Sequence, residues 1–265
     1  MYHLPAGEPE VWRRDFETLA DGGFRRLVLA EKHYDLDEVL RALGDCSRYG
    51  LSAYYVALNP VWLPPSLQAC KERHGRFRCV GIDGQTLTQF VYNPFHPGFR
   101  RSLLVPYLRT VARELGGHEA LAGFFLDDTM DTESVISYTP HDARAFRLFL
   151  KLRYGDLRSV NRSWGQHCRK WNDIVPPRIM LTWSRSWRRM WQDWCEARQS
   201  WWLDWARDVS GALKAAPRAE RILGDDWYSV RFGYDATGGF TPQMVERFDS
   251  FSFDYTSGTD YLDRG

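Results

Sequence analysis

The stretch Leu121-Ala122-Gly123-Phe124-Phe125-Leu126-Asp127-Asp128 decides the fold class, because a short apolar strand runs directly into two carboxylates. Short apolar strands of this kind are typical of a parallel sheet that helices cover. The stretch follows a predicted helix over 103–115, which Gly116-Gly117 ends. It therefore predicts a helix–strand unit with acids at the carboxyl end of its strand.

The same unit recurs along the chain. Further strands are predicted at 25–30, 53–58, 222–224 and 251–253, and further helices at 10–20, 36–49, 140–154, 157–164 and 184–215. Strands that alternate with helices indicate βαβ units and a parallel sheet. A length of 265 residues is close to the roughly 250 of a (β/α)₈ barrel.

We therefore predict an α/β fold of the (β/α)₈ TIM-barrel type, formed by a single domain over residues 1–265. Long βα insertions are expected at about 60–100 and 130–220. Because these insertions use up length, only about six of the eight β/α units fit into this chain.

Acids, amides and aromatic side chains follow five predicted strands. In a barrel the carboxyl ends of the strands converge on one face, so these residues would meet there. One Asp after a strand is also a common turn former or helix cap, and this alternative stays open for each residue alone. Paired carboxylic side chains beside aromatic rings suit sugar chemistry. The predicted sugar-binding residues are Glu31, Asn59, Trp62, Asp127, Asp225, Asp226, Trp227, Asp254 and Tyr255.

Composition and charge exclude several classes of protein. The 35 Lys+Arg and 34 Asp+Glu residues leave a charge of +1, which argues against a nucleic-acid binder. The chain has no run of 18 apolar residues and no signal-like start, so we expect no membrane partner. Five cysteines without a C-x-x-C pair indicate thiols in a reducing compartment, and hence a cytoplasmic protein.

A metal site is the weaker interpretation of the acids. Asp127, Asp128 and Asp131 could bind a hard cation, but the calcium-loop pattern is absent. No phosphate-binding loop, nucleophile elbow or His-Glu-x-x-His motif is found either. We therefore expect a carbohydrate ligand, no metal and no cofactor.

Tryptophans form a stripe on the predicted helix at 184–215 and just before it. Trp183, Trp187, Trp191, Trp194, Trp201 and Trp205 share one helical face. One interpretation is burial against the barrel or against a neighbouring subunit, which would make the Trp-rich helix 183–205 a homo-oligomer interface. The other is a sugar-stacking platform at the start of the helix, with Trp183 and Trp187 as its members.

A longer segment carries a family resemblance. The sequences AFRLFLKLRYGDL at 145–157 and VNRSWG at 160–165 resemble the "FR-x-WL-x-x-(K/R)YG-x-L-x-x-(L/V)N-x-x-WG" segment of the family 42 glycoside hydrolases. The WNDI at 171–174 with the PPR at 176–178 is similar to the "W-x-x-I-x-PPR" that follows in this family. Looser matches cover Tyr2–Trp12, Leu29–Glu31, Asn59–Leu63 and Asp249–Tyr255. The resemblance implies a β-galactosidase-like enzyme on a (β/α)₈ barrel, with two carboxyl groups acting by retaining double displacement.

The chain departs from the family at the catalytic positions. The family's strand 4 ends in Asp-Asn-Glu with Glu as acid/base, and the match here is Asp127-Asp128-Thr129. Thr129 thus stands at the acid/base position, and its hydroxyl cannot act as a general acid near neutral pH. Asp128 falls on the family's substrate-contacting Asn. Asp128, Asp131 or Glu133 could replace the acid, but with a displaced carboxyl group, and about 1 Å of displacement can cost about 100-fold in rate.

Two further departures concern a metal and the nucleophile. The family's metal cysteines after strand 4 are missing, and Ser137, Tyr138 and His141 stand in that region. The family nucleophile is a Glu on strand 7, whereas this sequence stops on the expected strand 6, so we expect a diverged, C-terminally truncated member.

Several functions stay open at this point. The chain is expected to be a glycosidase-derived barrel that acts on or binds β-linked sugars, and to be weak or inactive as an enzyme by itself. The alternatives are a non-catalytic carbohydrate-binding or scaffold barrel, a fragment of a longer enzyme, an active hydrolase that uses Asp128 or another acid, and an unrelated βα enzyme. We predict no hydrolysis of aryl β-galactosides by these 265 residues.

Overall fold

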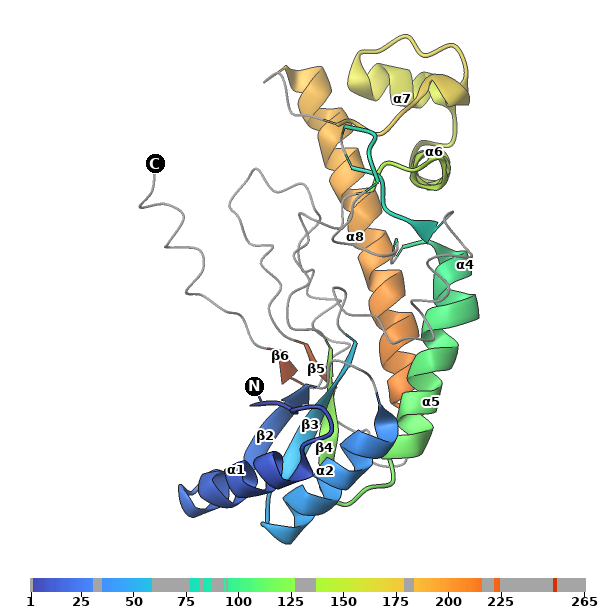
Figure 1. Cartoon of the computed structure of the whole chain (residues 1–265). Helices are drawn as coiled ribbons and strands as arrows, with labels where there is room; N and C mark the ends of the chain where they lie inside the picture. Colours follow the sequence, from blue (N-terminus) through green and yellow to red (C-terminus); the bar gives the residue numbers. More distant parts are fainter. Residues whose placement is uncertain are drawn as a thin grey trace.

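The computed structural model describes residues 2–30, 35–58, 77–81, 83–86, 93, 95–126, 137–178, 184–215, 222–224 and 250–251. Helices lie beside a sheet and extend well beyond it on one side (Figure 1). The elements are, in chain order, β1 (Tyr2–His3), α1 (Pro9–Asp21), β2 (Arg26–Ala30), α2 (Leu36–Arg48), β3 (Ser52–Leu58), α4 (Pro97–Phe99), the π-helix η2 (Arg100–Leu104), α5 (Val105–Leu115), β4 (Leu121–Leu126), α6 (Pro140–Tyr154), α7 (Leu157–Trp164), the 3₁₀-helix η3 (Trp171–Asp173), α8 (Arg185–Leu213), β5 (Ile222–Gly224) and β6 (Ser250–Phe251).

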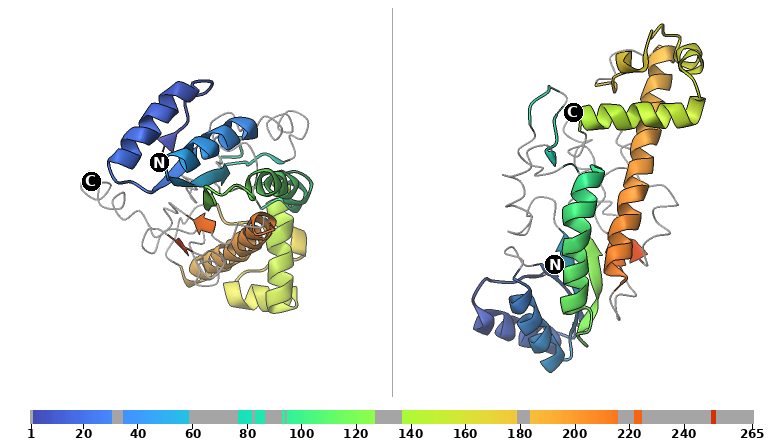
Figure 2. Two further views of the ribbon diagram at one scale, coloured as in Figure 1. Left: turned by 90° about the horizontal axis from the view of Figure 1, so that it is seen from below. Right: turned by 90° about the vertical axis from the view of Figure 1, so that its right-hand side faces the viewer.

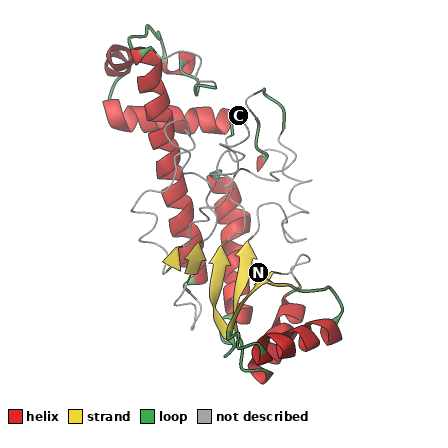
Figure 3. Cartoon of the chain, turned by 90° about the vertical axis from the view of Figure 1, so that its left-hand side faces the viewer, coloured by secondary structure: helices red, strands yellow, loops and turns green. Residues whose placement is uncertain are grey.

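The described strands form one parallel sheet in the order β1-β2-β3-β4-β5-β6 (Figure 3). Each strand therefore pairs with the strand before it in the chain. A barrel wall has this order, whereas a doubly wound sheet reverses direction at a switch point. The predicted parallel α/β class is confirmed. The two-residue strand β1 has no predicted counterpart, because it is too short to show a periodicity.

Local capping signals explain why most predicted helices begin and end where they do. The Asp35 carboxylate accepts hydrogen bonds from the backbone N–H groups of Asp37 and Glu38 at the start of α2. Asp156 caps α7 in the same way, and Gly165 ends it in the left-handed conformation, at φ 64°. One predicted boundary is wrong. The helix expected from 103 starts earlier, at Pro97, since α4, η2 and α5 follow one another without a break. The His96 side chain caps this start by accepting a hydrogen bond from Gly98 N.

The two faces of the sheet differ in what covers them. The main core lies on one face, where Leu29, Tyr55 and Phe124 pack with side chains of the covering helices α1, α2, α5 and α8. On the other face Val28, Ala30, Tyr54, Val56, Ala122 and Phe125 form a separate cluster, and no described helix joins it. Helices outside and strand side chains inside are the arrangement of a barrel wall.

A second core lies away from the sheet, among α6, α7 and the first half of α8 (Figures 1 and 2). Its buried members include Phe146, Val160, Trp164 and Trp194. The 29 residues of α8 span about 43 Å and connect this core to the sheet. Among the described helices, none is long and apolar enough to cross a membrane.

The tryptophan stripe is explained largely by burial inside this chain. Trp205 is fully buried in the main core, Trp194 is fully buried in the second core, and Trp201 packs against both. Trp187 and Trp191 are partly buried and stack on each other, with ring centroids 6.5 Å apart. Trp183 lies outside the described residues. The homo-oligomer interface, the single-domain organisation and the insertion boundaries stay predictions.

Candidate active-site edge

The carboxyl ends of four strands lie level with one another at one edge of the sheet. Leu58 of β3 pairs with Leu126 of β4, Leu126 pairs with Gly224 of β5, and Gly224 pairs with Phe251 of β6. These four residues therefore form one row across the sheet. Ala30 of β2 belongs to the same edge, since Leu29 pairs with Tyr55, three residues before Leu58.

All predicted site residues lie outside the described residues: Glu31, Asn59, Trp62, Asp127, Asp128, Thr129, Trp183, Asp225, Asp226, Trp227, Asp254 and Tyr255. The structure does describe the strand ends that directly precede several of these residues. Asn59, Asp127 and Asp225 each directly follow a member of the row, on three adjacent strands. Neighbouring strands are about 4.8 Å apart, so the three strand ends lie within about 10 Å.

The chemistry that this edge can support follows from that spacing. Retaining glycosidases hold two carboxyl groups about 5–5.5 Å apart across the glycosidic bond, and inverting ones about 6.5–9.5 Å apart. Residues that directly follow the ends of adjacent strands start close enough together for either distance between carboxyl groups. Below the edge, Ala30, Val56 and Phe125 are buried in the apolar inner cluster, which keeps water away from that side.

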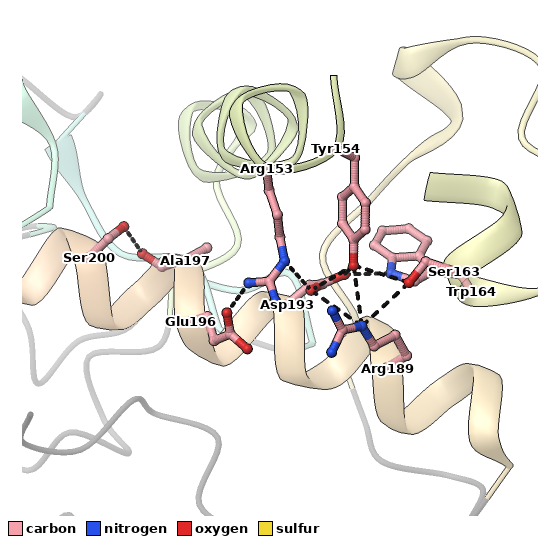
Figure 4. A network of polar contacts seen from close by, with 9 residues as sticks. All are labelled: Arg153, Tyr154, Ser163, Trp164, Arg189, Asp193, Glu196, Ala197 and Ser200. Carbon is pink, nitrogen blue, oxygen red and sulfur yellow. Dashed lines mark hydrogen bonds and ion pairs between the residues drawn. The ribbon is translucent and has the colours of Figure 1, made fainter. Parts of the chain in front are cut away.

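A polar network that the sequence patterns did not predict lies in the second core, centred on Asp193 of α8 (Figure 4). The side chain of Asp193 is fully buried, and Oδ2 accepts hydrogen bonds from the Tyr154 hydroxyl at 2.8 Å and from Trp164 Nε1 at 2.6 Å. Oδ1 pairs with Arg153 Nε at 3.3 Å and with Arg189 Nε at 3.9 Å. The network thus joins α6, α7 and α8 through one carboxylate.

The Asp193 network gives the family-like segment a structural role. Tyr154 and Trp164 belong to the "YG" and "WG" parts of that segment, and both donate to Asp193. Arg147, also in the segment, donates to the carbonyl oxygens of Asn172 and Ile174. These contacts hold α6, α7 and η3 together at a distance from the strand ends. The sequence signal was one of four acids on α8, and a helical-face pattern does not single out Asp193 among them.

No group of three or more His, Cys, Asp or Glu side chains that could hold a metal ion occurs within the described part of the chain. Cys46 and Cys168 are thiols that form no disulfide. Burial raises the pKa of Cys46 to about 12, with a smaller contribution from the Asp45 carboxylate, so this thiol stays protonated at neutral pH.

Comparisons with known proteins agree with the fold and with the motif. Residues 70–222 match the glycoside hydrolase family 42 profile, which is described as β-galactosidase. A β-galactosidase of Arthrobacter sp. is 30% identical over 197 residues, and a β-galactosidase of Thermus thermophilus is 25% identical over 234 residues. The aligned regions cover 64% and 80% of this chain, but only 27% and 33% of those relatives.

A solved structure supports the architecture. The polyextremophilic β-galactosidase of the haloarchaeon Halorubrum lacusprofundi superposes with a TM-score of 0.80 at 20% identity. The superposition covers 96% of this chain and 39% of that protein. This likeness shows the fold, which is part of a (β/α)₈ barrel. Because the profile matches more than half of the residues, the chain belongs to glycoside hydrolase family 42, the β-galactosidase family, and spans about a third of the length of its relatives.

Proposed function

We propose that this chain binds β-linked galactosides at the carboxyl edge of its sheet and does not hydrolyse them by itself. The observation that carries the proposal is the row Leu58–Leu126–Gly224, which aligns the strand ends that precede Asn59, Asp127 and Asp225 on adjacent strands. Family membership supports a sugar as the ligand, because the matched relatives are β-galactosidases.

Binding and turnover are expected to separate in this chain. Carboxylates accept hydrogen bonds from sugar hydroxyls, and Trp62 or Trp227 offers an aromatic face for the ring. Departure of the aglycone, however, needs a proton from a general acid, and the resemblance puts Thr129 at that position. General acid catalysis contributes about 10²–10⁴ in rate, so a sugar can bind here without being cleaved.

The test uses the 265-residue chain with methyl β-galactoside in calorimetry and with lactose in a hydrolysis assay, because the sugar alcohol that leaves from lactose needs a proton from the general acid. We expect measurable binding and no release of glucose. Asp127→Asn and Asp225→Asn are each expected to weaken binding about 10- to 100-fold, because each removes a hydrogen bond to a charged group. Glu17→Gln, an exposed carboxylate on α1, is the matched control and should leave the affinity unchanged.

Two outcomes would contradict the proposal in different ways. Undetectable binding by the intact chain would reject the sugar site and leave a scaffold role. Glucose release from lactose that Asp128→Asn abolishes would show an active hydrolase with Asp128 as the acid. The cytoplasmic location and self-association through the Trp-rich helix 183–205 also stay proposals, which cell fractionation and analytical ultracentrifugation can check.

A further inference from the structure

Four buried polar side chains meet where the described residues between 77 and 95 contact the start of α6. Segment 77–95 here means these described residues, 77–81, 83–86, 93 and 95. Asn93, Ser137, Thr139 and Asp142, here called the polar clasp, are each less than 8% exposed. Its neighbours Phe77 and Phe95 belong to the main core and Tyr138 to the second core, and Ser137 is the first described residue after the segment that carries Asp127–Thr129. Buried polar groups are costly unless they are hydrogen-bonded, so their partners decide what the clasp does.

The Asp142 carboxylate is the centre of the clasp. Its Oδ1 accepts from Asn93 Nδ2 at 2.7 Å. Its Oδ2 accepts from the backbone N–H of Thr139 at 2.8 Å and from the Thr139 hydroxyl at 2.6 Å. The Thr139 hydroxyl in turn accepts from Asp142 N, which closes a capping box. Both carboxylate oxygens are thus occupied by donors of this chain.

The remaining members tie the segment 77–95 to the same point. Asn93 Oδ1 accepts from Phe95 N at 3.0 Å, and Ser137 Oγ accepts from Val80 N at 3.3 Å. Next to them, Tyr138 N donates to Val80 O at 2.9 Å. Two segments more than 40 residues apart in the chain are therefore cross-linked by hydrogen bonds.

A buried cation, Arg198, interacts electrostatically with Asp142. The guanidinium of Arg198 on α8 is 1% exposed and lies over the rings of Phe95 and Trp194, each at 5.5 Å. Burial lowers the pKa of Arg198, and the nearby charges of Tyr138 and Asp142 act in the opposite direction. The faces of Phe95 and Trp194 stabilise this desolvated cation at its position near the clasp.

The resemblance to family 42 implies metal cysteines in this region, and the residues present do not fit such a site. A structural zinc ion needs four ligands, mostly thiolates and imidazoles. Here Cys79 offers a single thiol beside Ser137, Ser137 and Thr139 offer neutral hydroxyls, Asn93 an amide, and Asp142 a carboxylate whose oxygens are already used, so at most one thiolate is present where several are needed. Within the described residues, no three His, Cys, Asp or Glu side chains converge.

We propose that the polar clasp replaces the metal site, so that this chain holds segment 77–95 against α6 without a metal ion. Hydrogen bonds to one charged carboxylate do the cross-linking that metal–thiolate bonds would otherwise do.

The experiment measures the metal content and the thermal stability of the purified full chain. Plasma mass spectrometry should find metal far below one equivalent, and EDTA should leave the Tm unchanged. Asp142→Asn should lower the Tm by about 5–10 °C, because it removes charge-assisted hydrogen bonds from a buried site. Asp204→Asn, at a largely exposed ion pair with Arg207, is the matched control and should leave the Tm unchanged.

A second pair of variants covers the case in which Asp142→Asn does not fold. Thr139→Val should lower the Tm and Thr139→Ser should restore most of it, because only serine keeps the hydroxyl. One equivalent of bound zinc, with a Tm that falls in EDTA and returns with zinc, would overturn the proposal. A wild-type Tm for the clasp variants, Asp142→Asn or Thr139→Val, would overturn it as well.

Discussion

Asp193 shows how one residue decides the stability of a whole region. A carboxylate that is fully removed from water is tolerated only when its oxygens are well paired. Tyr154, Trp164 and Arg153 supply that pairing from two other helices. Removal of the charge leaves these donors facing a group that can no longer accept from all of them.

We predict that Asp193→Asn lowers the free energy of unfolding by about 2–4 kcal/mol, because the substitution leaves buried donors unsatisfied while it conserves the shape. Urea denaturation followed by circular dichroism measures this change. Glu196→Gln is the control: Glu196 pairs with the same Arg153 but is 43% exposed, so we expect a change within about 0.5 kcal/mol. Equal effects of the two substitutions would contradict a central role for Asp193.

At the scale of elements, a histidine contact joins the first turns of α4 and α6. The rings of His96 and His141 are in contact, with centroids 4.2 Å apart and an angle of 31° between the ring planes. Burial lowers the pKa of His141 from its ordinary 6.5, and the charges of Arg144 and Arg100 lower it further, whereas Asp142 opposes the shift. A cation in the first turn of α6 would also oppose the positive end of the helix dipole.

We predict that the burial of His141 makes stability depend on pH. Since the folded-state pKa of His141 lies below 6.5, the unfolded chain binds the proton first as the pH falls. The contribution of neutral His141 to the free energy of unfolding is fully present above pH 6.5. It is lost as the pH falls from 6.5 through the lower, folded-state pKa. Urea midpoints measured from pH 8 to pH 5 should decline in the wild type and decline less in His141→Gln. Identical pH profiles would rule out His141 as the cause.

At the scale of the whole molecule, α8 is the element that makes one body out of two cores. Trp205 fills the core on the sheet, Trp194 fills the core of α6 and α7, and Trp201 lies in edge-to-face contact with Trp194 at 5.5 Å. Trp194, Trp201 and Trp205 therefore form an internal seam along α8.

We predict that Trp194→Ala destabilises the protein by about 3–5 kcal/mol, because it leaves a large cavity in this seam. Trp187→Ala is the matched control on the same helix, and its cost should be much smaller, since Trp187 is only partly buried. Guanidinium denaturation measures the stability of both variants, and galactoside titration measures their affinity for the sugar. Together they distinguish burial from sugar stacking as the role of the stripe. Loss of sugar binding in a well-folded Trp187→Ala would favour the stacking platform instead.

Much of the fold could be predicted because its signals are local. Thr139-Pro140 and Asp156 start helices, Gly165 ends one, and short apolar runs mark β3 and β4, all through neighbours within a few residues. The start at Pro97 was missed because His96 is an uncommon N-cap, although a helix start with Pro at its first position is a known signal.

The sequence by itself determined the order of helices and strands, the family, and the Thr129 departure at the acid position. Only the tertiary structure decided that Leu58, Leu126 and Gly224 share a row, that Trp194 and Trp205 are buried within this chain, and that Asp142 and Asp193 are cross-linking carboxylates. The physical reason is range: a cap or an apolar period acts between near neighbours, whereas strand register and the pairing of a buried charge depend on groups that only folding brings together.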